Sequence, residues 1–222
     1  MLNASRPWLV RSLALSLFAA LAVPALRAQA VTGNPTLDRQ LSRIDIGVGA
    51  MGSFTKDVSG TNKKPGIPLS QQASSTVGAL VQVRYTKSAW VGLEFNYGYA
   101  RYTQNFSNYI VGGAQANASE YTLGYVAHPT RQFAGFQPFF GGGVGTTAFR
   151  PTPNGGQGLP SQARMTYYYD AGIEKVVLGD HFGVRAQFRQ TFFKAPDFGQ
   201  DYLTIQQHTN TIEPGIGFFL RF

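Results

Sequence analysis

The sequence predicts an all-β fold, a single eight-stranded antiparallel up-and-down transmembrane β-barrel. Three observations predict it. Apolar and polar residues alternate with a period of two in eight segments, long and short connections alternate between those segments, and no segment after the first 30 residues is apolar for long enough to form a membrane helix. Because the composition alone also suits a soluble β-sandwich, these patterns decide the fold class.

The first 30 residues are expected to be a cleaved secretory signal. Arg6 and Arg11 give the segment a basic start, and the apolar stretch at 13–23 is too short to span a bilayer comfortably. Ala28 and Ala30 supply the small residues that precede a cleavage point. A retained membrane helix is the alternative, and the short apolar stretch argues against it.

Eight strands are expected in the rest of the chain. A short periplasmic segment at 31–42 precedes the barrel domain, residues 43–222. The strands are expected at 43–56, 74–87, 90–104, 117–128, 136–150, 163–178, 182–194 and 208–222.

The seven connections between these strands alternate between long and short. The long ones are rich in Gly, Pro, Asn and Gln and are expected at 57–73, 105–116, 151–162 and 195–207. The short ones are expected at 88–89, 129–135 and 179–181. An up-and-down barrel of the outer-membrane type has short turns at the periplasmic rim and long loops outside. A Greek-key sandwich gives no reason for this order.

Each expected strand has one apolar face and one polar face. In strand 90–104, for example, Leu93, Phe95 and Tyr97 share one parity, while Glu94 and Asn96 share the other. The polar faces are rich in Gly, Thr, Asp, Glu and Arg, which is unusual for a solvent surface but suits the interior of a narrow barrel that side chains fill. We therefore expect the apolar face to meet lipid.

The inward parity collects charges of both signs. Its members are Asp45, Arg84, Glu94, Glu120, Arg164, Asp170, Glu174, Arg185, Arg189, Glu213 and Arg221. Charges in a confined lumen must be paired or hydrated, so the leading interpretation is a network that fills and fixes the barrel. Arg185 and Glu94 are one candidate facing pair. A gated narrow pore is the alternative, and paired acids for catalysis are the third interpretation.

Aromatic residues on the lipid-facing parity are expected to form two belts at the bilayer interfaces. Those toward the outer rim are Phe54, Tyr99, Tyr121, Tyr167 and Phe192. Those toward the periplasmic rim are Tyr85, Phe182 and Phe222.

Strand 136–150 has the weakest pattern, because its glycine run has no clean alternation. Pro138 and Pro214 also lie within expected strands, and each removes a backbone donor from the ladder. We expect β-bulges at both prolines.

Two motifs connect the chain to a known family. Residues 137–145 read QPFFGGGVG, and the chain ends in GIGFFLRF at 215–222. With these motifs the chain resembles the OmpA-like superfamily of small outer-membrane β-barrel proteins over essentially its whole mature length. The resemblance implies that the terminal Phe222 is the signal by which the barrel assembly machinery recognises its clients. Larger members carry a peptidoglycan-binding domain after the barrel; we expect none here, so the resemblance does not imply wall anchoring.

The sequence offers no strong catalytic, metal or cofactor motif. It has no cysteine, which excludes disulfides, thiolate metal sites and a lipoprotein anchor. The histidines His128, His181 and His208 are scattered and predict no metal site. Outer-membrane lipid A deacylases carry a serine two positions after a histidine, and Asn210 occupies that position after His208. We expect no enzyme and no cofactor, and we interpret His208 as a loop or rim residue.

The leading functional hypothesis is a structural or surface-interaction protein of the bacterial outer membrane that displays loops on a membrane anchor with a charge-filled lumen. The alternative is a narrow channel for small or hydrophobic solutes, as OmpW-like barrels are thought to provide, and the third is a lipid A-modifying enzyme. Removal of the signal takes away three arginines and no acid, so the formal charge falls from +8 to +5 without a basic stripe, and we expect no nucleic-acid partner. The expected partners are outer-membrane lipid, lipopolysaccharide and the assembly machinery. The residues do not identify any surface ligand.

Overall fold

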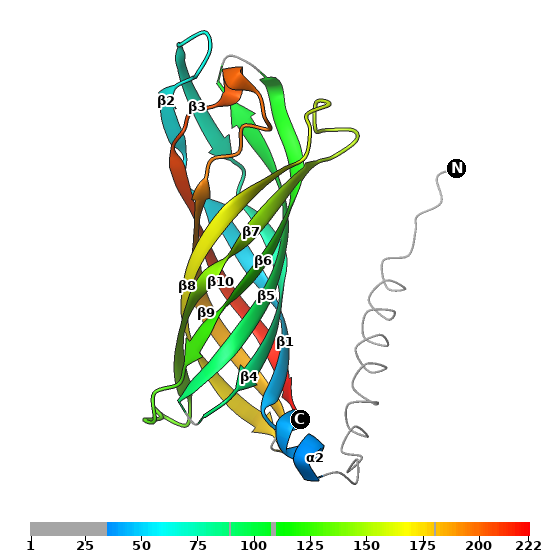
Figure 1. The fold of residues 1–222 in the computed structure, drawn as a ribbon, viewed down its shortest axis with the longest axis vertical. Helices are drawn as coiled ribbons and strands as arrows, with labels where there is room; N and C mark the ends of the chain where they lie inside the picture. The colour runs from blue at the N-terminus through cyan, green and yellow to red at the C-terminus, as the bar shows by residue number, and fades with distance from the viewer. Residues whose placement is uncertain (1–34, 89, 108–109, 180) are drawn as a thin grey trace, which may run out of the picture. The chain divides into compact units, whose positions relative to one another are not determined.

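A computed structural model describes residues 35–88, 90–107, 110–179 and 181–222, and it contains a closed antiparallel β-barrel of eight strands (Figure 1). The barrel unit spans Arg43–Arg221. The expected signal and its cleavage residues Ala28 and Ala30 lie outside the described residues. Among the described residues, no helix is long and apolar enough to cross a membrane.

The eight barrel strands follow one another around the wall in chain order. They are β1 (Ile44–Thr55), β4 (Thr76–Thr86), β5 (Val91–Phe106), β6 (Ile110–Ala127), β7 (Gln137–Pro151), β8 (Gln162–Leu178), β9 (Phe182–Lys194) and β10 (His208–Arg221). Each strand pairs with the next, and β10 pairs with β1 to close the ring. Closure leaves the ring of eight strands without an open edge, so that neighbouring strands supply the backbone donors and acceptors around the whole wall. The predicted fold class is confirmed.

In the described part of the chain, four further elements are not among the eight strands of the ring. Helix α2 (Pro35–Leu41) falls within the N-terminal segment, and its proline takes the first helical position, where the missing N–H costs nothing. The 3-10 helix η1 (Asp201–Leu203) lies between β9 and β10. Strands β2 (Val58–Thr61) and β3 (Pro68–Ala73) form a hairpin in what was expected to be an irregular loop, and β3 pairs with the end of β5.

The expected long loop at 105–116 is wrong. Strand β5 continues to Phe106 and β6 already begins at Ile110, with a register shift after Gln104. The composition suggested a loop because Ala, Gly, Gln and Asn dominate this stretch. Alternate residues such as Ala114 and Ala116 are nevertheless fully buried, so a period of two is present in residues too small to reveal it by hydropathy.

The expected bulges at the two prolines are also wrong. Pro138 lies within an unbroken β7–β8 register, beyond Phe140, which is the last β7 residue paired with β6. Pro214 lies within an unbroken β9–β10 register, whereas the β1–β10 ladder omits Glu213 and Pro214 and then resumes with the same offset. Each proline therefore interrupts hydrogen bonding to one neighbouring strand locally, and neither strand contains the extra residue that defines a bulge.

The two faces of the barrel wall separate as expected in the half that carries the short turns, which we call the turn end. Its outward face exposes large apolar side chains, among them Ile46, Val48, Leu93, Phe95, Leu123, Tyr125, Phe140, Val144, Ile173, Phe188, Ile216 and Phe218. Its inward face buries the ionised residues of the strands. This apolar exterior around a polar interior is the arrangement that a bilayer requires.

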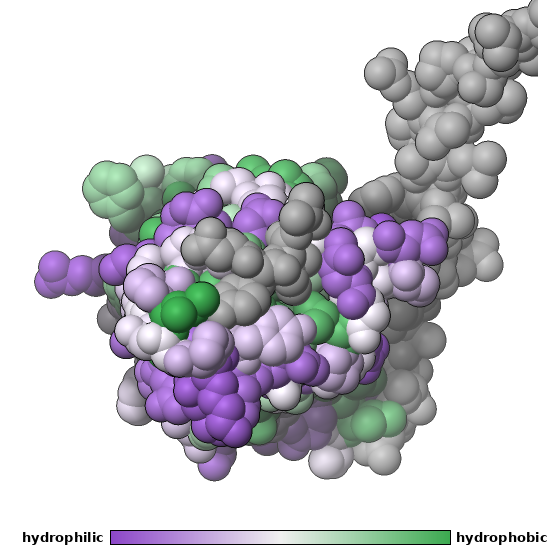
Figure 2. All heavy atoms as spheres, turned by 90° about the horizontal axis from the view of Figure 1, so that it is seen from above, coloured by the Kyte–Doolittle hydropathy of each residue, from purple (hydrophilic) through white to green (hydrophobic). Residues whose placement is uncertain are grey.

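The faces exchange character toward the other end, which we call the loop end. Inward residues there are apolar, including Tyr102, Phe149 and Phe193, and all three are buried. Outward residues at the same level are polar, including Arg101 and Arg150. Figure 2, which looks onto the loop end, shows mainly hydrophilic residues among the described ones. We call the part of the wall with the apolar exterior the membrane zone. Past this zone the barrel continues as a sheet with a polar exterior around an apolar core, as in a water-soluble protein.

Candidate functional site

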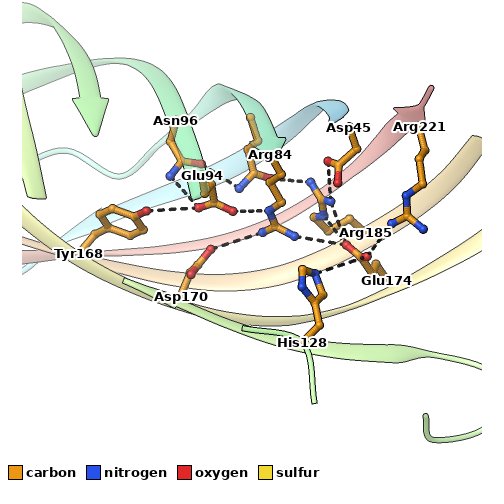
Figure 3. Close-up of polar contacts among 11 residues, drawn as sticks. Asp45, Arg84, Glu94, Asn96, His128, Tyr168, Asp170, Glu174, Arg185 and Arg221 are labelled. Carbon is orange, nitrogen blue, oxygen red and sulfur yellow. Dashed lines mark hydrogen bonds and ion pairs between the residues drawn. The ribbon is translucent and has the colours of Figure 1, made fainter. Parts of the chain in front are cut away.

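The lumen at the turn end holds a group of buried ion pairs centred on Arg84 of β4 (Figure 3). Its Nε donates to Glu94 Oε2, and its Nη1 donates to Glu174 Oε2 at 3.2 Å. Its Nη2 lies 3.8 Å from Asp170 Oδ2. Since Arg84 and Glu94 are both 0% exposed, this arginine is held by carboxylates from β5 and β8 without contact with solvent.

A second arginine, Arg185 of β9, shares one of those carboxylates. Its Nη2 donates to Glu174 Oε2 at 2.8 Å and to Asp45 Oδ1 at 3.0 Å. Glu174 therefore joins Arg84 to Arg185 across the lumen. The structure does not bring Arg185 to Glu94, the candidate facing pair, because Glu94 is taken by Arg84.

Two further residues reach Glu174 from the turn end. Arg221 Nη2 donates to Glu174 Oε1 at 3.3 Å, and His128 Nε2 lies 3.8 Å from the same oxygen. His128 is buried, although its place beside Pro129 suggested an ordinary turn residue. The lumen network, as we name it, consists of Asp45, Arg84, Glu94, His128, Asp170, Glu174, Arg185 and Arg221.

The register of the barrel explains part of the lumen network. Arg84 is the direct cross-strand partner of Glu94, and Arg185 is that of Glu174. Opposite charges at directly paired positions attract with little loss of side-chain freedom. The contact between Arg84 and Glu174 joins β4 to β8 across the lumen and depends on the width of the barrel.

Neutral side chains complete the lumen network. Asn96 Nδ2 donates to Glu94 Oε1 at 2.7 Å, and Tyr168 Oη lies 3.4 Å from the same oxygen. The ring of Phe139, which is fully buried, lies under Arg84 with 4.1 Å between Cζ and the ring centroid. Cation–π contacts of this kind stabilise a desolvated guanidinium. Phe139 and Tyr168 were not predicted as lumen residues, because aromatic side chains on the inward face do not stand out from an apolar pattern in the way that charged ones do.

Small residues make room for this packing at two points of the glycine run. A Cβ added to Gly141 would lie 2.1 Å from Asp170 Oδ1, and one added to Gly145 would lie 2.0 Å from the carbonyl oxygen of Tyr121. Any side chain at these positions would displace the Asp170 carboxylate or the neighbouring strand. The glycines at these two positions therefore serve close packing.

Nearer the middle of the barrel, a second ionic group, the Arg189 triad, comprises Arg189, Glu120 and Glu213. Arg189 Nη1 donates to Glu213 Oε2 at 2.7 Å, and its Nη2 donates to Glu120 Oε1 and to Thr122 Oγ1. The guanidinium stacks on Tyr168, with Cζ 4.5 Å from the ring centroid. Arg189 is 0% exposed, and Glu120 and Glu213 are also buried, so this triad crosses the interior of the lumen.

Arg164 does not join either ionic group. Its Nη2 lies 2.8 Å from Asp197 Oδ1 at the loop end. Asp197 belongs to the β9–β10 connection, residues 195–207, which we call the cap. Gln162 also holds the cap, since its Oε1 accepts the backbone N–H groups of Asp197 and Phe198 at 3.0 Å.

The cap folds inward over the loop end and does not extend as a free loop. Its side chains Phe198, Leu203 and Ile205 are buried against the inward face of the strands, where Phe198 contacts Phe106 with 6.4 Å between ring centroids. The outer core, as we name this cluster, consists of Val58, Leu69, Ala100, Tyr102, Phe106, Ala114, Ala116, Ala118, Phe149, Phe193, Ala195, Phe198, Leu203 and Ile205.

The lumen between the Arg189 triad and the outer core contains a small cavity. Met51, Gly98, Tyr102 and Glu213 contribute to its lining, and its volume is about 20 Å³. A cavity of that size holds roughly a single water molecule.

The two acids of the cap should make its closure depend on pH. Partial burial opposes ionisation of Asp197, but hydrogen bonds from Gln162 and Gly199 and the charge of Arg164 outweigh it and lower its pKa. Hydrogen bonds from Lys63 lower the pKa of the exposed Asp201. A carboxylate with a lowered pKa stabilises the folded form above the unfolded value of about 4, and that contribution is lost as the pH falls through the folded value.

We therefore expect backbone hydrogen exchange in residues 195–207 to be slow and constant from pH 7 down to about 4, after correction for the intrinsic rate, and to rise below it. The variant Asp197→Asn should exchange faster at pH 7 and show a weaker pH response. An unchanged cap in acid, in the native protein, would contradict the role given to these carboxylates.

Comparisons with known proteins agree with this geometry. The sequence profile of the family described as "Outer membrane protein beta-barrel domain" matches residues 13–218. Among solved structures, the outer membrane protein OprG from Pseudomonas aeruginosa is similar at 18% identity and a TM-score of 0.59, over 81% of this chain and 95% of that one. Neisserial surface protein A is similar at 13% identity and a TM-score of 0.52, over 80% and 97%. No curated protein matches by sequence.

Proposed function

This chain belongs to the outer membrane protein beta-barrel domain family, and we propose that it is a membrane anchor whose lumen is filled and whose loop end carries a folded, outward-facing surface. The observation that carries the proposal is the complete burial of charged residues across the lumen, since Arg84 and Arg189 are both 0% exposed. A lumen crossed by fixed ion pairs stiffens the barrel and leaves no room for a solute.

Three successive layers support a closed lumen. The lumen network occupies the turn end, the Arg189 triad the middle, and the outer core with the cap the loop end. The cavity between the last two layers has room for about one water molecule. A channel would need all three of these layers to rearrange, so the anchor is favoured over the narrow pore.

The contacts of His208, the candidate rim histidine, also favour an anchor over a lipid A-modifying enzyme. His208 lies at the exposed start of β10 as the cross-strand partner of Lys194. The neighbouring hydroxyl of Thr209 donates to the carbonyl oxygen of Lys56 at 2.6 Å, so it is engaged with backbone. A nucleophile and base within hydrogen-bond distance, as acyl transfer requires, are not formed by these two side chains.

Export and assembly belong to the same proposal. The expected signal, cleaved after Ala30, would deliver the chain to the periplasm. The exposed terminal Phe222 would then be recognised by the barrel assembly machinery. The outer membrane of a bacterium is the location that the family implies.

Planar-bilayer recordings test the anchor against the channel. The purified mature protein should give no stepwise conductance under conditions in which a known porin does, and reconstituted vesicles should take up no small solute beyond the level of empty vesicles. Steady unitary currents from the protein would overturn the anchor proposal. Release of acyl chains from lipopolysaccharide by the purified protein would instead support the enzyme.

A further inference from the structure

The charged residues of the barrel strands are sorted by sign between the two faces. Within the described residues, all carboxylates on barrel strands point inward, namely Asp45, Glu94, Glu120, Asp170, Glu174 and Glu213. The ionic side chains that point outward from these strands are all basic, namely Arg101, Arg150, Lys175 and Lys194. The outward wall therefore presents positive charge without any strand carboxylate beside it.

Two of these arginines lie in one row across three neighbouring strands. Arg101 of β5 is the cross-strand partner of Asn117 on β6, and Asn117 is the partner of Arg150 on β7. Since adjacent strands lie about 4.8 Å apart, the two arginine Cα atoms are separated by about 10 Å. Both side chains are long enough to reach one anion between them.

The row is held in place from below. Arg101 Nε donates to Asn117 Oδ1 at 2.7 Å, and the hydroxyl of Tyr99 donates to the same oxygen at 3.0 Å. Within the described ranges, the two Nη groups of Arg101 form neither an ion pair nor a side-chain hydrogen bond. Among the described residues, Arg150 forms neither an ion pair nor a side-chain hydrogen bond, so its whole guanidinium is available.

The height of the row on the wall identifies its surroundings. Outward residues of β5 are apolar or aromatic from Val91 to Tyr99, and Arg101 is the first charged one. Ten residues at about 3.3 Å each, in a strand tilted by about 40°, raise Arg101 about 25 Å above Val91, which matches the height of the apolar band of outer-membrane barrels. The interior changes from ionic to apolar near the same level. The row therefore lies at the headgroups of the outer leaflet.

We propose that Arg101, Asn117 and Arg150, the arginine row, form a binding site for a phosphate group on an anionic lipid of the outer leaflet. Two guanidinium groups can donate paired hydrogen bonds to the phosphate oxygens. The apolar wall directly below contacts the acyl chains of the same lipid. This site goes beyond the anchor proposal, since an anchor with a filled lumen requires no particular lipid.

Titration of the detergent-solubilised mature protein with phosphorylated lipid A tests the site, with the bound fraction measured by native mass spectrometry. The double variant Arg101→Gln/Arg150→Gln should bind at least about tenfold more weakly than the native protein. The affinity of the double variant Arg101→Lys/Arg150→Lys should lie between those of the native protein and the glutamine variant, because lysine keeps the charge but cannot donate the paired hydrogen bonds of a guanidinium. Lipid A without its phosphates should bind all three proteins equally weakly.

A matched control removes the same charge at the turn end. The variant Arg131→Gln/Lys175→Gln changes two exposed basic residues there and should bind phosphorylated lipid A as the native protein does. Equal loss in this control, or unchanged binding in the double glutamine variant, would overturn the site. Displacement of the lipid by inorganic phosphate at an equal concentration would show a site for free anions and would overturn its assignment to a lipid. Conductance recordings do not depend on these residues, so failure of this site leaves the anchor proposal standing.

Discussion

Replacement of Arg189 by methionine is expected to destabilise the folded barrel by about 3–5 kcal/mol at neutral pH. Methionine nearly fills the space of the arginine stem but leaves Glu120 and Glu213 buried together without a cation. Two desolvated carboxylates then repel each other in a medium of low polarity, where their interaction is strong. Urea unfolding of the protein in detergent or vesicles, followed by heat-modified electrophoretic mobility, measures the loss.

The triple variant Arg189→Met/Glu120→Gln/Glu213→Gln separates charge from packing. It removes the uncompensated charges while keeping most of the volume, so it should recover most of the stability that the single variant loses. The exposed Arg131, changed to methionine, should alter stability by less than about 0.5 kcal/mol. A single variant as stable as the native protein would mean that the triad is hydrated and the lumen is not closed there.

Replacement of Phe149 by alanine is expected to open the cap. The ring is 0% exposed and contacts Phe193 and Tyr102, with centroid separations of 5.5 Å and 6.3 Å. Loss of a fully buried phenylalanine from a packed core costs about 3–5 kcal/mol, and the cap is the part of the outer core that is held by few backbone ladders. Hydrogen exchange and proteolysis in residues 195–207 should therefore accelerate strongly while the barrel strands stay protected.

The outward Phe140, changed to alanine, is the control for that experiment. Its side chain is 57% exposed at the turn end, on the lipid-facing side of β7, and it has no contact with the outer core. Cap exchange should be unchanged in this variant. Equal acceleration in both variants would indicate general loosening of the barrel, and no acceleration in Phe149→Ala would show that the outer core does not hold the cap.

Strict alternation allowed most of the barrel to be predicted from the sequence. Strand β5 was predicted because Leu93, Phe95 and Tyr97 alternate with Glu94 and Asn96 in an unbroken pattern. The first residues of β6 were not predicted as a strand, because Ala114 and Ala116 are buried but only weakly apolar. The β2–β3 hairpin was missed because it pairs with β5 beyond the membrane zone, where neither face is continuously apolar.

The candidate site could be predicted by face but not by partner. Parity was enough to place Arg84, Arg185 and Glu174 inside the barrel. The pairing of each arginine with a particular carboxylate depends on the strand register and on which strands lie opposite each other across the lumen. Neither can be predicted from a local sequence pattern. Arg164 illustrates this, since its partner Asp197 lies in a connection whose inward fold follows from burial of Phe198.

The outward side of β5 changes from apolar to polar residues between Tyr99 and Arg101, and the account depends on this change. A spin-label accessibility scan along β5 in a lipid bilayer tests it most directly. The chain has no cysteine, so single substitutions such as Phe95→Cys and Thr103→Cys can be labelled cleanly. Labels at 93, 95, 97 and 99 should collide mainly with oxygen dissolved in the lipid, and labels at 101, 103 and 105 mainly with a water-soluble nickel complex. Preferential access of the nickel complex at 93 to 99, or no change of preference along the strand, would contradict the account.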